Sequence, residues 1–188
     1  GSLKGKHDVI RVSALIRDNI PYKTFKVNTM VPAVGLKVGE WRVLGIYREW
    51  ALQGDQTTKT KEQQIERLSN FVDYWLKVRC KCICIGDFNF DPAPHTEYQR
   101  SLEPVRTCIN DVLLPAGWRQ LIRGHTRNEA GQEPATLDHV YCNAVNRTER
   151  TWNEGLSGYD HNLVGVRFKT QGTIFKSETF AFRDVKTV

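Results

Sequence analysis

Residues 82–89 read CICIGDFN, and this stretch decides the fold. Together with Cys80 it gives a nearly continuous apolar run up to Ile85, which is typical of a strand inside a sheet that is covered on both faces. The polar residues Asp87 and Asn89 follow directly. Polar groups at a strand end lie at the rim of a sheet, where rigid backbone can direct them into a shared cleft. A tight turn would explain this stretch alone equally well.

Two later stretches repeat this combination of an apolar strand and a polar cluster. Residues 136–140 read TLDHV and residues 158–162 read GYDHN. A chance Asp-His pair would explain either one, but three such clusters in one chain favour a common site. Because side chains alternate along a strand, His139 is predicted to face away from Asp138 and to have a structural role.

Hydrophobic periodicity predicts one long helix among several short strands. Apolar residues recur at helical spacing between about Thr60 and Lys77, which predicts an amphipathic helix there. Residues 34–38 and 41–47 flank Gly39-Glu40 and are predicted to form a hairpin. Further strands are predicted at residues 9–16, 25–31, 80–85, 121–122, 137–142 and 163–168. Strands with interspersed helices place the chain in the α/β or α+β class.

Composition limits the classes of function. The 188 residues suit one globular domain, with 40% hydrophobic and 26% charged residues, and no apolar stretch is long enough for a transmembrane span. The net charge of +6 favours a partner with a phosphate backbone. Cys80, Cys82 and Cys84 alternate along one strand, a spacing that suits buried, reduced cysteines better than a zinc site. An intracellular location is therefore expected.

The three polar clusters resemble the motifs of the endonuclease/exonuclease/phosphatase superfamily. Residues 86–89 resemble its Gly-Asp-Phe-Asn signature, residues 137–141 its strand with a hydrophobic-Asp-His pattern, and residues 159–161 stand where the family has Ser-Asp-His. Residues 44–48 resemble its strand that ends in Tyr-Arg. Two further segments are similar to the retrotransposon branch. Thr126-Arg127 resembles the Thr-Arg that precedes its Asp strand, and residues 182–186 are similar to the segment that links the endonuclease to the reverse transcriptase in such elements.

The resemblance implies a fold and a domain layout. The expected fold is a four-layered α/β-sandwich of the pancreatic deoxyribonuclease type that lacks its first strands. Residues 1–5 are interpreted as a tag or linker remnant and residues 6–170 as a partial nuclease domain. Residues 171–188 are interpreted as a last strand or a linker toward a reverse transcriptase. Lost strands would leave sheet edges that another segment must cover.

The resemblance also implies roles for individual side chains. His161 would be the catalytic imidazole, oriented by Asp138, and Asp87 would orient or deprotonate the attacking water. Which of these groups is the base stays open. The other implied roles are phosphate contacts for Asn89 and Tyr47, metal binding for Asp160 and Asp87, and DNA or phosphate contacts for Arg48, Thr126 and Arg127. The implied cofactor is Mg²⁺ or Mn²⁺, since hard cations prefer oxygen ligands.

These roles predict a nuclease that nicks double-stranded DNA and leaves a 3′-hydroxyl as a primer for a linked reverse transcriptase, in the nucleus. The family's principal metal ligand is a Glu at the end of an early strand, and no Glu of this chain fits that position. Two alternatives therefore stay open. The chain can be a catalytically impaired DNA-binding or assembly module, or it can be a phosphatase-type member of the superfamily.

Overall fold

A computed structural model describes residues 12–27, 31–48, 58–76, 78–93 and 102–169. The expected segments 1–5 and 171–188 lie outside these residues. One sheet has six strands in the order β1-β2-β3-β4-β6-β5, and a second sheet pairs β7 with β8. The strands are β1 (Tyr22–Phe25), β2 (Ala33–Val38), β3 (Trp41–Tyr47), β4 (Lys81–Asp87), β5 (Arg119–Gln120), β6 (Asp138–Cys142), β7 (Thr148–Glu154) and β8 (Leu163–Phe168). The helices are α1 (Thr58–Leu76), α3 (Glu103–Cys108), the π-helix η1 (Ile109–Leu113) and the 3-10 helix η2 (Val145–Arg147).

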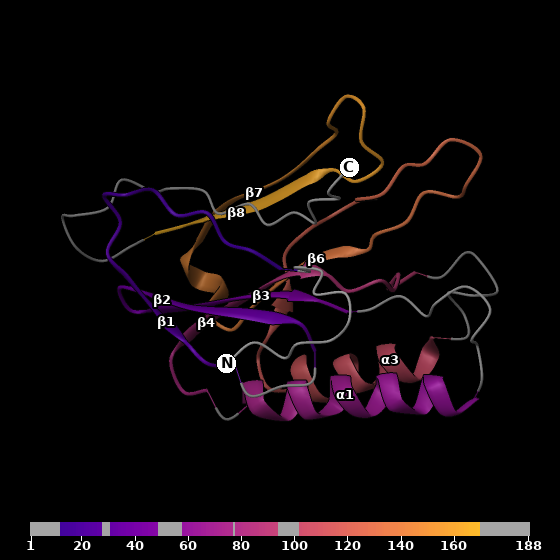
Figure 1. Ribbon diagram of the computed structural model, residues 1–188, viewed down its shortest axis with the longest axis horizontal. Helices are drawn as coiled ribbons and strands as arrows, with labels where there is room; N and C mark the ends of the chain where they lie inside the picture. Colours follow the sequence, from indigo (N-terminus) through magenta and orange to yellow (C-terminus); the bar gives the residue numbers. More distant parts are fainter. Residues whose placement is uncertain (1–11, 28–30, 49–57, 77, 94–101, 170–188) are drawn as a thin grey trace, which may run out of the picture.

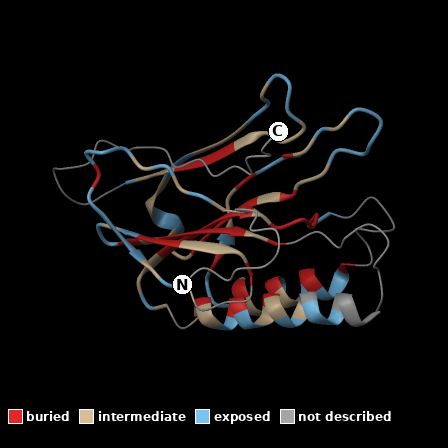
Figure 2. Ribbon diagram, in the orientation of Figure 1, coloured by how far each residue is buried: buried red, intermediate tan, exposed pale blue. Residues whose placement is uncertain are grey.

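The larger sheet is the middle layer of the molecule. Helices α1 and α3 lie along one of its faces and the β7-β8 sheet lies on the other side (Figure 1). Strand β4 shows how the sequence separates the two cores: Cys82 and Cys84 pack with the helices, whereas Ile83 and Ile85 pack with β8. Figure 2 shows the buried strands between these layers. The mixed α/β class and a central strand covered on both faces are thus confirmed.

Helix α1 connects the parallel strands β3 and β4, a connection that requires a crossover. Its apolar face is buried against the sheet through Leu68, Phe71, Val72 and Trp75. Full burial of such side chains contributes about 1.5–3 kcal/mol each, so this face anchors the helix. Trp75 meets Trp118 edge-on, with ring centroids 4.8 Å apart. The predicted helix is confirmed, and so is the hairpin of β2 and β3.

Gly86 lets β4 approach β3 closely. A Cβ atom at this position would lie 1.9 Å from the carbonyl oxygen of Ile46. Only glycine fits a contact of that length without movement of the backbone. The close approach places the ends of β3 and β4 side by side, with Tyr47 and Asp87 as register partners.

Several strand predictions need correction. Residues 12–16, the described part of the predicted strand 9–16, form no strand, because strand propensity has effect only where a neighbour offers pairing. The strand predicted at 25–31 ends at Phe25 instead, and β5 precedes the predicted residues 121–122. Strand β7 was not predicted, since its only apolar residue is Trp152. In the described part of the chain, no helix has the length and hydropathy needed to cross a membrane.

Candidate active site

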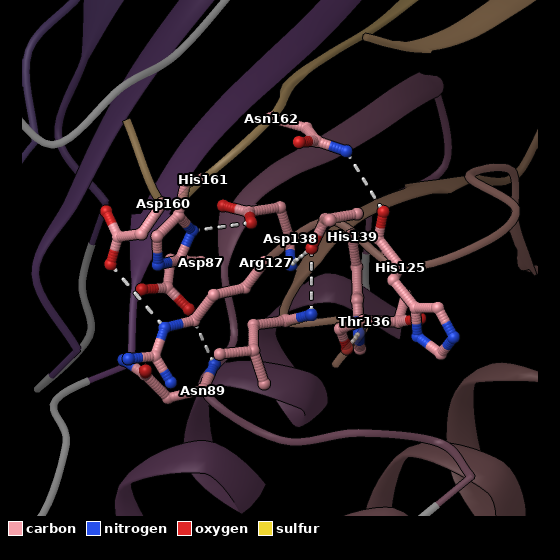
Figure 3. A network of polar contacts seen from close by, with 12 residues as sticks. Asp87, Asn89, His125, Arg127, Thr136, Asp138, His139, Asp160, His161 and Asn162 are labelled. Carbon is pink, nitrogen blue, oxygen red and sulfur yellow. Dashed lines mark hydrogen bonds and ion pairs between the residues drawn. The ribbon is translucent and has the colours of Figure 1, made fainter. Parts of the chain in front are cut away.

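The three polar clusters of the sequence meet beside the ends of the central strands β4 and β6 of the larger sheet. Asp87 at the end of β4 is the register partner of Tyr47 on β3 and of Asp138 on β6. His161 comes from the loop that precedes β8 in the smaller sheet. In Figure 3 the imidazole of His161 lies beside the carboxylates of Asp138 and Asp87. Residues far apart in the chain thus converge on one site, as the motifs predict.

His161 and Asp138 form the central pair of this site. The Nδ1 atom of His161 lies 2.8 Å from the Oδ2 atom of Asp138. Burial lowers the pKa of His161, but the hydrogen bond to Asp138 and the charges of Asp138, Asp87 and Asp160 outweigh it, so the pKa is raised above its usual value. A bond at Nδ1 also fixes the ring and leaves Nε2 available for a substrate. The pair can therefore hold an imidazolium beside a phosphate.

Asp87 interacts electrostatically with both members of this pair. Burial, and next the negative charge of Asp138, raise the pKa of Asp87 to about 7, although His161, the amide of Asn89 and Arg48 all act to lower it. A carboxylate that titrates near neutral pH can take a proton from water and release it again. Its pKa is thus suited to a general base.

The loop after β4 is held by a buried arginine. The backbone of Asn89 is in the left-handed region, with φ of 50°, and its amide donates to Oδ1 of Asp87 over 2.8 Å. Arg48 is 3% exposed and donates to the carbonyl oxygens of Phe88 and Asn89, the latter at 2.6 Å. In return, Nδ2 of Asn89 donates to the carbonyl oxygen of Arg48 at 2.6 Å.

This placement changes the interpretation of Arg48. The sequence predicts a contact with DNA phosphate, whereas the structure directs the guanidinium into the protein, where it holds the backbone of residues 88–89. Asn89 itself is 5% exposed. The geometry favours a positioning role for Arg48, because a guanidinium that is bound to buried carbonyls is not presented to solvent.

Thr126 and Arg127, for which the resemblance also implies DNA or phosphate contacts, lie in different surroundings. Thr126 is fully buried, and its hydroxyl accepts hydrogen bonds from the amides of Leu137 and Asp138. Arg127 is partly exposed and forms an ion pair with Asp160, 3.6 Å from Nε to Oδ2, and another with Glu129. Of the three predicted DNA contacts, Arg127 is the one whose guanidinium lies beside the site and also reaches solvent (Figure 3).

His139 is structural, as the strand alternation predicts. Its imidazole is fully buried and stacks on Phe88, with ring centroids 5.0 Å apart. Burial lowers its pKa to about 4, so the ring is neutral at physiological pH. Its nitrogens lie 3.2 Å from the hydroxyl of Tyr141 and 3.0 Å from the carbonyl oxygen of Thr136. The five cysteines are all free, and Cys82, Cys84 and Cys142 are buried.

Sequence reasoning missed Asp91. This residue is 2% exposed, and its carboxylate accepts from the amides of Ala93 and Thr136, both at 2.8 Å. The guanidinium of Arg106, which is also buried, donates to the backbone carbonyl of Asp91 at 3.0 Å. These bonds hold the segment that leads into Asp138. The only signal in the sequence is that Asp91 follows the Gly-Asp-Phe-Asn motif by two residues.

The described residues fit a divalent metal only in part. Asp87 and Asp160 offer carboxylate oxygens, which Mg²⁺ prefers. However, Asp160 is engaged by Arg127 at 3.6 Å. No group of three or more His, Cys, Asp or Glu side chains within the described ranges is arranged to hold a metal ion. These residues alone therefore do not form a complete metal site.

The fold is similar to that of several solved nucleases and phosphatases. A 3′ phosphatase from Neisseria, bound to a product DNA hairpin, matches with TM-score 0.54 and 20% identity over 73% of this chain. An AP endonuclease from Archaeoglobus fulgidus matches with TM-score 0.56 and 13% identity over 81% of the chain. A 3′-5′ exonuclease from Neisseria meningitidis matches with TM-score 0.52 and 16% identity, also over 81%.

The chain covers 65%, 65% and 64% of the length of these three proteins. No family model and no curated protein matches its sequence. Because the identities are low, the likeness concerns the fold. The chain thus shares the fold of these three proteins, and the fold that the resemblance of its motifs implies is confirmed.

Proposed function

We propose that this chain carries the hydrolytic centre of a phosphodiesterase that nicks double-stranded DNA and leaves a 3′-hydroxyl. The observation that supports this is the hydrogen-bonded pair of His161 and Asp138 next to Asp87. An imidazolium can stabilise negative charge and supply a proton, and a carboxylate with a pKa near neutrality can accept one, which are tasks that such a hydrolysis includes.

The reaction needs a nucleophile, charge stabilisation and a proton for the leaving group. In the proposed step, water attacks phosphorus, the new P–O bond forms and the P–O3′ bond breaks. Asp87 accepts the proton of the water, and His161 stabilises the negative charge on the phosphate and supplies a proton to the 3′ oxygen. Asp138 keeps the imidazole charged and oriented through Nδ1. The reverse division, with His161 as base, uses the same groups and stays open.

Dependence on Mg²⁺ or Mn²⁺ is part of the proposal. A bound cation would neutralise charge on the phosphate, and Asp160 and Asp87 are the described carboxylates that would contact it. The described residues do not complete this site, so no step of the reaction is assigned to the metal. Phosphate contacts by Tyr47, Asn89 and Arg127 belong to the same proposal.

The finer function, target nicking for a retrotransposon, rests on sequence. Thr126-Arg127 and residues 182–186 resemble that branch, and the latter lie outside the described residues. The proposed partners are double-stranded DNA and a reverse transcriptase domain in the same polypeptide, and the proposed place of action is the nucleus. The net charge of +6 supports a polyanionic substrate.

A second candidate function is DNA binding without cleavage. The incomplete metal site favours it, since a nuclease centre that is short of a ligand can retain a basic binding surface. A phosphatase acting on a small phosphomonoester would use the same catalytic groups, and the motifs do not distinguish it from the nuclease.

The decisive experiment is nicking of supercoiled plasmid with Mg²⁺ and with EDTA. The parent chain is compared with His161→Ala and with His125→Ala, whose imidazole is exposed and points away from His161 in Figure 3. We expect nicking that needs Mg²⁺, falls about 10²–10⁴-fold in His161→Ala and is unchanged in His125→Ala.

Each other outcome supports a rival. If the protein shifts the plasmid on a gel at low salt but leaves it uncut, and an N-terminally extended form of the protein does the same, the DNA-binding module is supported. Release of phosphate from a small monoester, with plasmid untouched, supports the phosphatase.

A further inference from the structure

Thr126 makes an unusual set of hydrogen bonds for a threonine outside regular structure. Its side chain is fully buried. The Oγ1 atom accepts from two consecutive amides, those of Leu137 and Asp138, each at 2.9 Å. A hydroxyl oxygen has two lone pairs, so this one oxygen satisfies both donors. The backbone on either side of the start of β6 is thus tied to a single side chain.

The main chain of the same residue holds the other half of the catalytic pair. The carbonyl oxygen of Thr126 accepts from the amide of Asn162, the residue after His161, at 2.7 Å. The next residue, Arg127, forms β-bridges with Ala135 and with His161. Residues 126–127 therefore lie between the segment that leads to Asp138 and the segment that carries His161.

This position matters because the catalytic pair spans two sheets. Asp138 begins β6 in the six-stranded sheet, whereas His161 precedes β8 in the two-stranded sheet. No strand pairing joins the two sheets in the part of the chain that the structure describes. The distance between Asp138 and His161 therefore depends on how the sheets are docked, and hydrogen bonds of Thr126 reach both sides of that junction.

We infer that Thr126 is a positioning residue that sets the geometry of the pair Asp138–His161 by hydrogen-bonding the backbone next to both members. The catalytic consequence rests on the proposed function, whereas the positioning itself does not. A valine has the shape of threonine but no acceptor, so it would leave two buried amides without a partner. A serine keeps the acceptor and removes only a methyl group.

The experiment compares Thr126→Val with Thr126→Ser in the full chain. The matched control is Thr148→Val, because the hydroxyl of Thr148 is buried without a hydrogen-bond partner. Hydrogen exchange at the amides of Leu137 and Asp138 reports positioning without any need for activity. Steady-state nicking, where the chain is active, reports the catalytic effect.

We expect Thr126→Val to speed exchange at both amides by at least ~10-fold relative to the rest of β6, as for the loss of one hydrogen bond. We also expect kcat to fall by about 100-fold with little change in KM, because a small misplacement of a catalytic group affects the transition state. Thr126→Ser and Thr148→Val should resemble the parent in both measurements. If Thr126→Val does not fold, Thr126→Ser is compared with the parent: parent-like protection of both amides supports the inference, and a loss of that protection overturns it.

Two exchange results overturn the inference: unchanged exchange at Leu137 and Asp138 in Thr126→Val, or a loss of protection in Thr126→Ser as large as that in Thr126→Val. An active chain whose kcat is unchanged in Thr126→Val also overturns it. If the parent chain is inactive but the exchange pattern follows the expectation, the positioning role stands and the proposed function is what fails.

Discussion

The two halves of the site are held in different ways. The carboxylate half, Asp87 with the loop to Asn89, continues directly from a central strand and is bonded to the buried Arg48. The imidazole half, residues 158–162, is a partly exposed loop whose contacts include those with Thr126, Arg127 and Asp138. One half is built into the sheet, whereas the other is docked onto it. We therefore expect substitutions that break the packing or the hydrogen bonds of the first half to cost stability, and substitutions in the second half to cost activity.

The largest expected effect comes from the junction of the halves. Asp138→Asn keeps the side chain's shape but removes the negative charge that orients the ring of His161 and raises its pKa. Nicking activity should fall by roughly 10³-fold, the scale on which a misoriented imidazole loses activity. The melting temperature should change little, because Asp138 remains partly exposed. Nicking assays and thermal unfolding of the same samples measure activity and melting temperature. A variant with a clearly lower melting temperature but the specific activity of the parent would contradict this expectation.

Gly86→Ala tests the built-in half. A Cβ there meets the carbonyl oxygen of Ile46 at 1.9 Å, so β3 and β4 must separate, and we expect a loss of about 3–4 kcal/mol in the free energy of unfolding. Gly131→Ala is the control, because Gly131 also has positive φ, 79°, but nothing within 4 Å of an added Cβ. It should cost only about 1–2 kcal/mol. Urea denaturation separates the two, and equal losses would contradict the close approach.

Arg48→Met tests how much the buried guanidinium stabilises the carboxylate half of the site. The loss of its guanidinium leaves the carbonyl groups of Phe88 and Asn89 without these donors in a buried site. We expect a loss of about 2–3 kcal/mol in the free energy of unfolding. Arg150→Met, at an exposed position of β7, should be nearly neutral. If Arg48 served DNA phosphate instead, the variant would keep its stability and lose affinity for duplex DNA, which a salt titration of binding measures.

The last prediction concerns the dependence of stability on pH. The pKa of Asp87 is raised in the folded protein to about 7, so its ionisation weakens the fold as pH rises from about 4 to about 7. Asp87→Asn removes that ionisation. In EDTA the stability of the variant relative to the parent should rise as pH increases from about 4 to about 7, and the difference should vanish near pH 4. Urea titrations at pH 4, 6 and 8 test this, and a difference that is constant across pH would count against the raised pKa.

The sequence predicts the elements that have a local signal. Helix α1 follows from apolar spacing, the β2-β3 hairpin from the Gly39-Glu40 turn, and β4 from its continuous apolar run. Strand β7 has no such signal, because only Trp152 is apolar among its seven residues. Its place in the fold depends on pairing with β8, which begins nine residues after β7 ends.

What the sequence by itself determined is the set of chemical groups: Asp87, Asp138 and His161, each beside a strand and in the order of the motifs that they resemble. Only the tertiary structure decided what surrounds them. Arg48 and Thr126, both predicted to contact DNA or phosphate, are buried, with hydrogen-bond partners 40 and 11 residues away. The physical reason is that a strand's periodicity is local, whereas burial and the partner of a polar group depend on which segments the fold brings together.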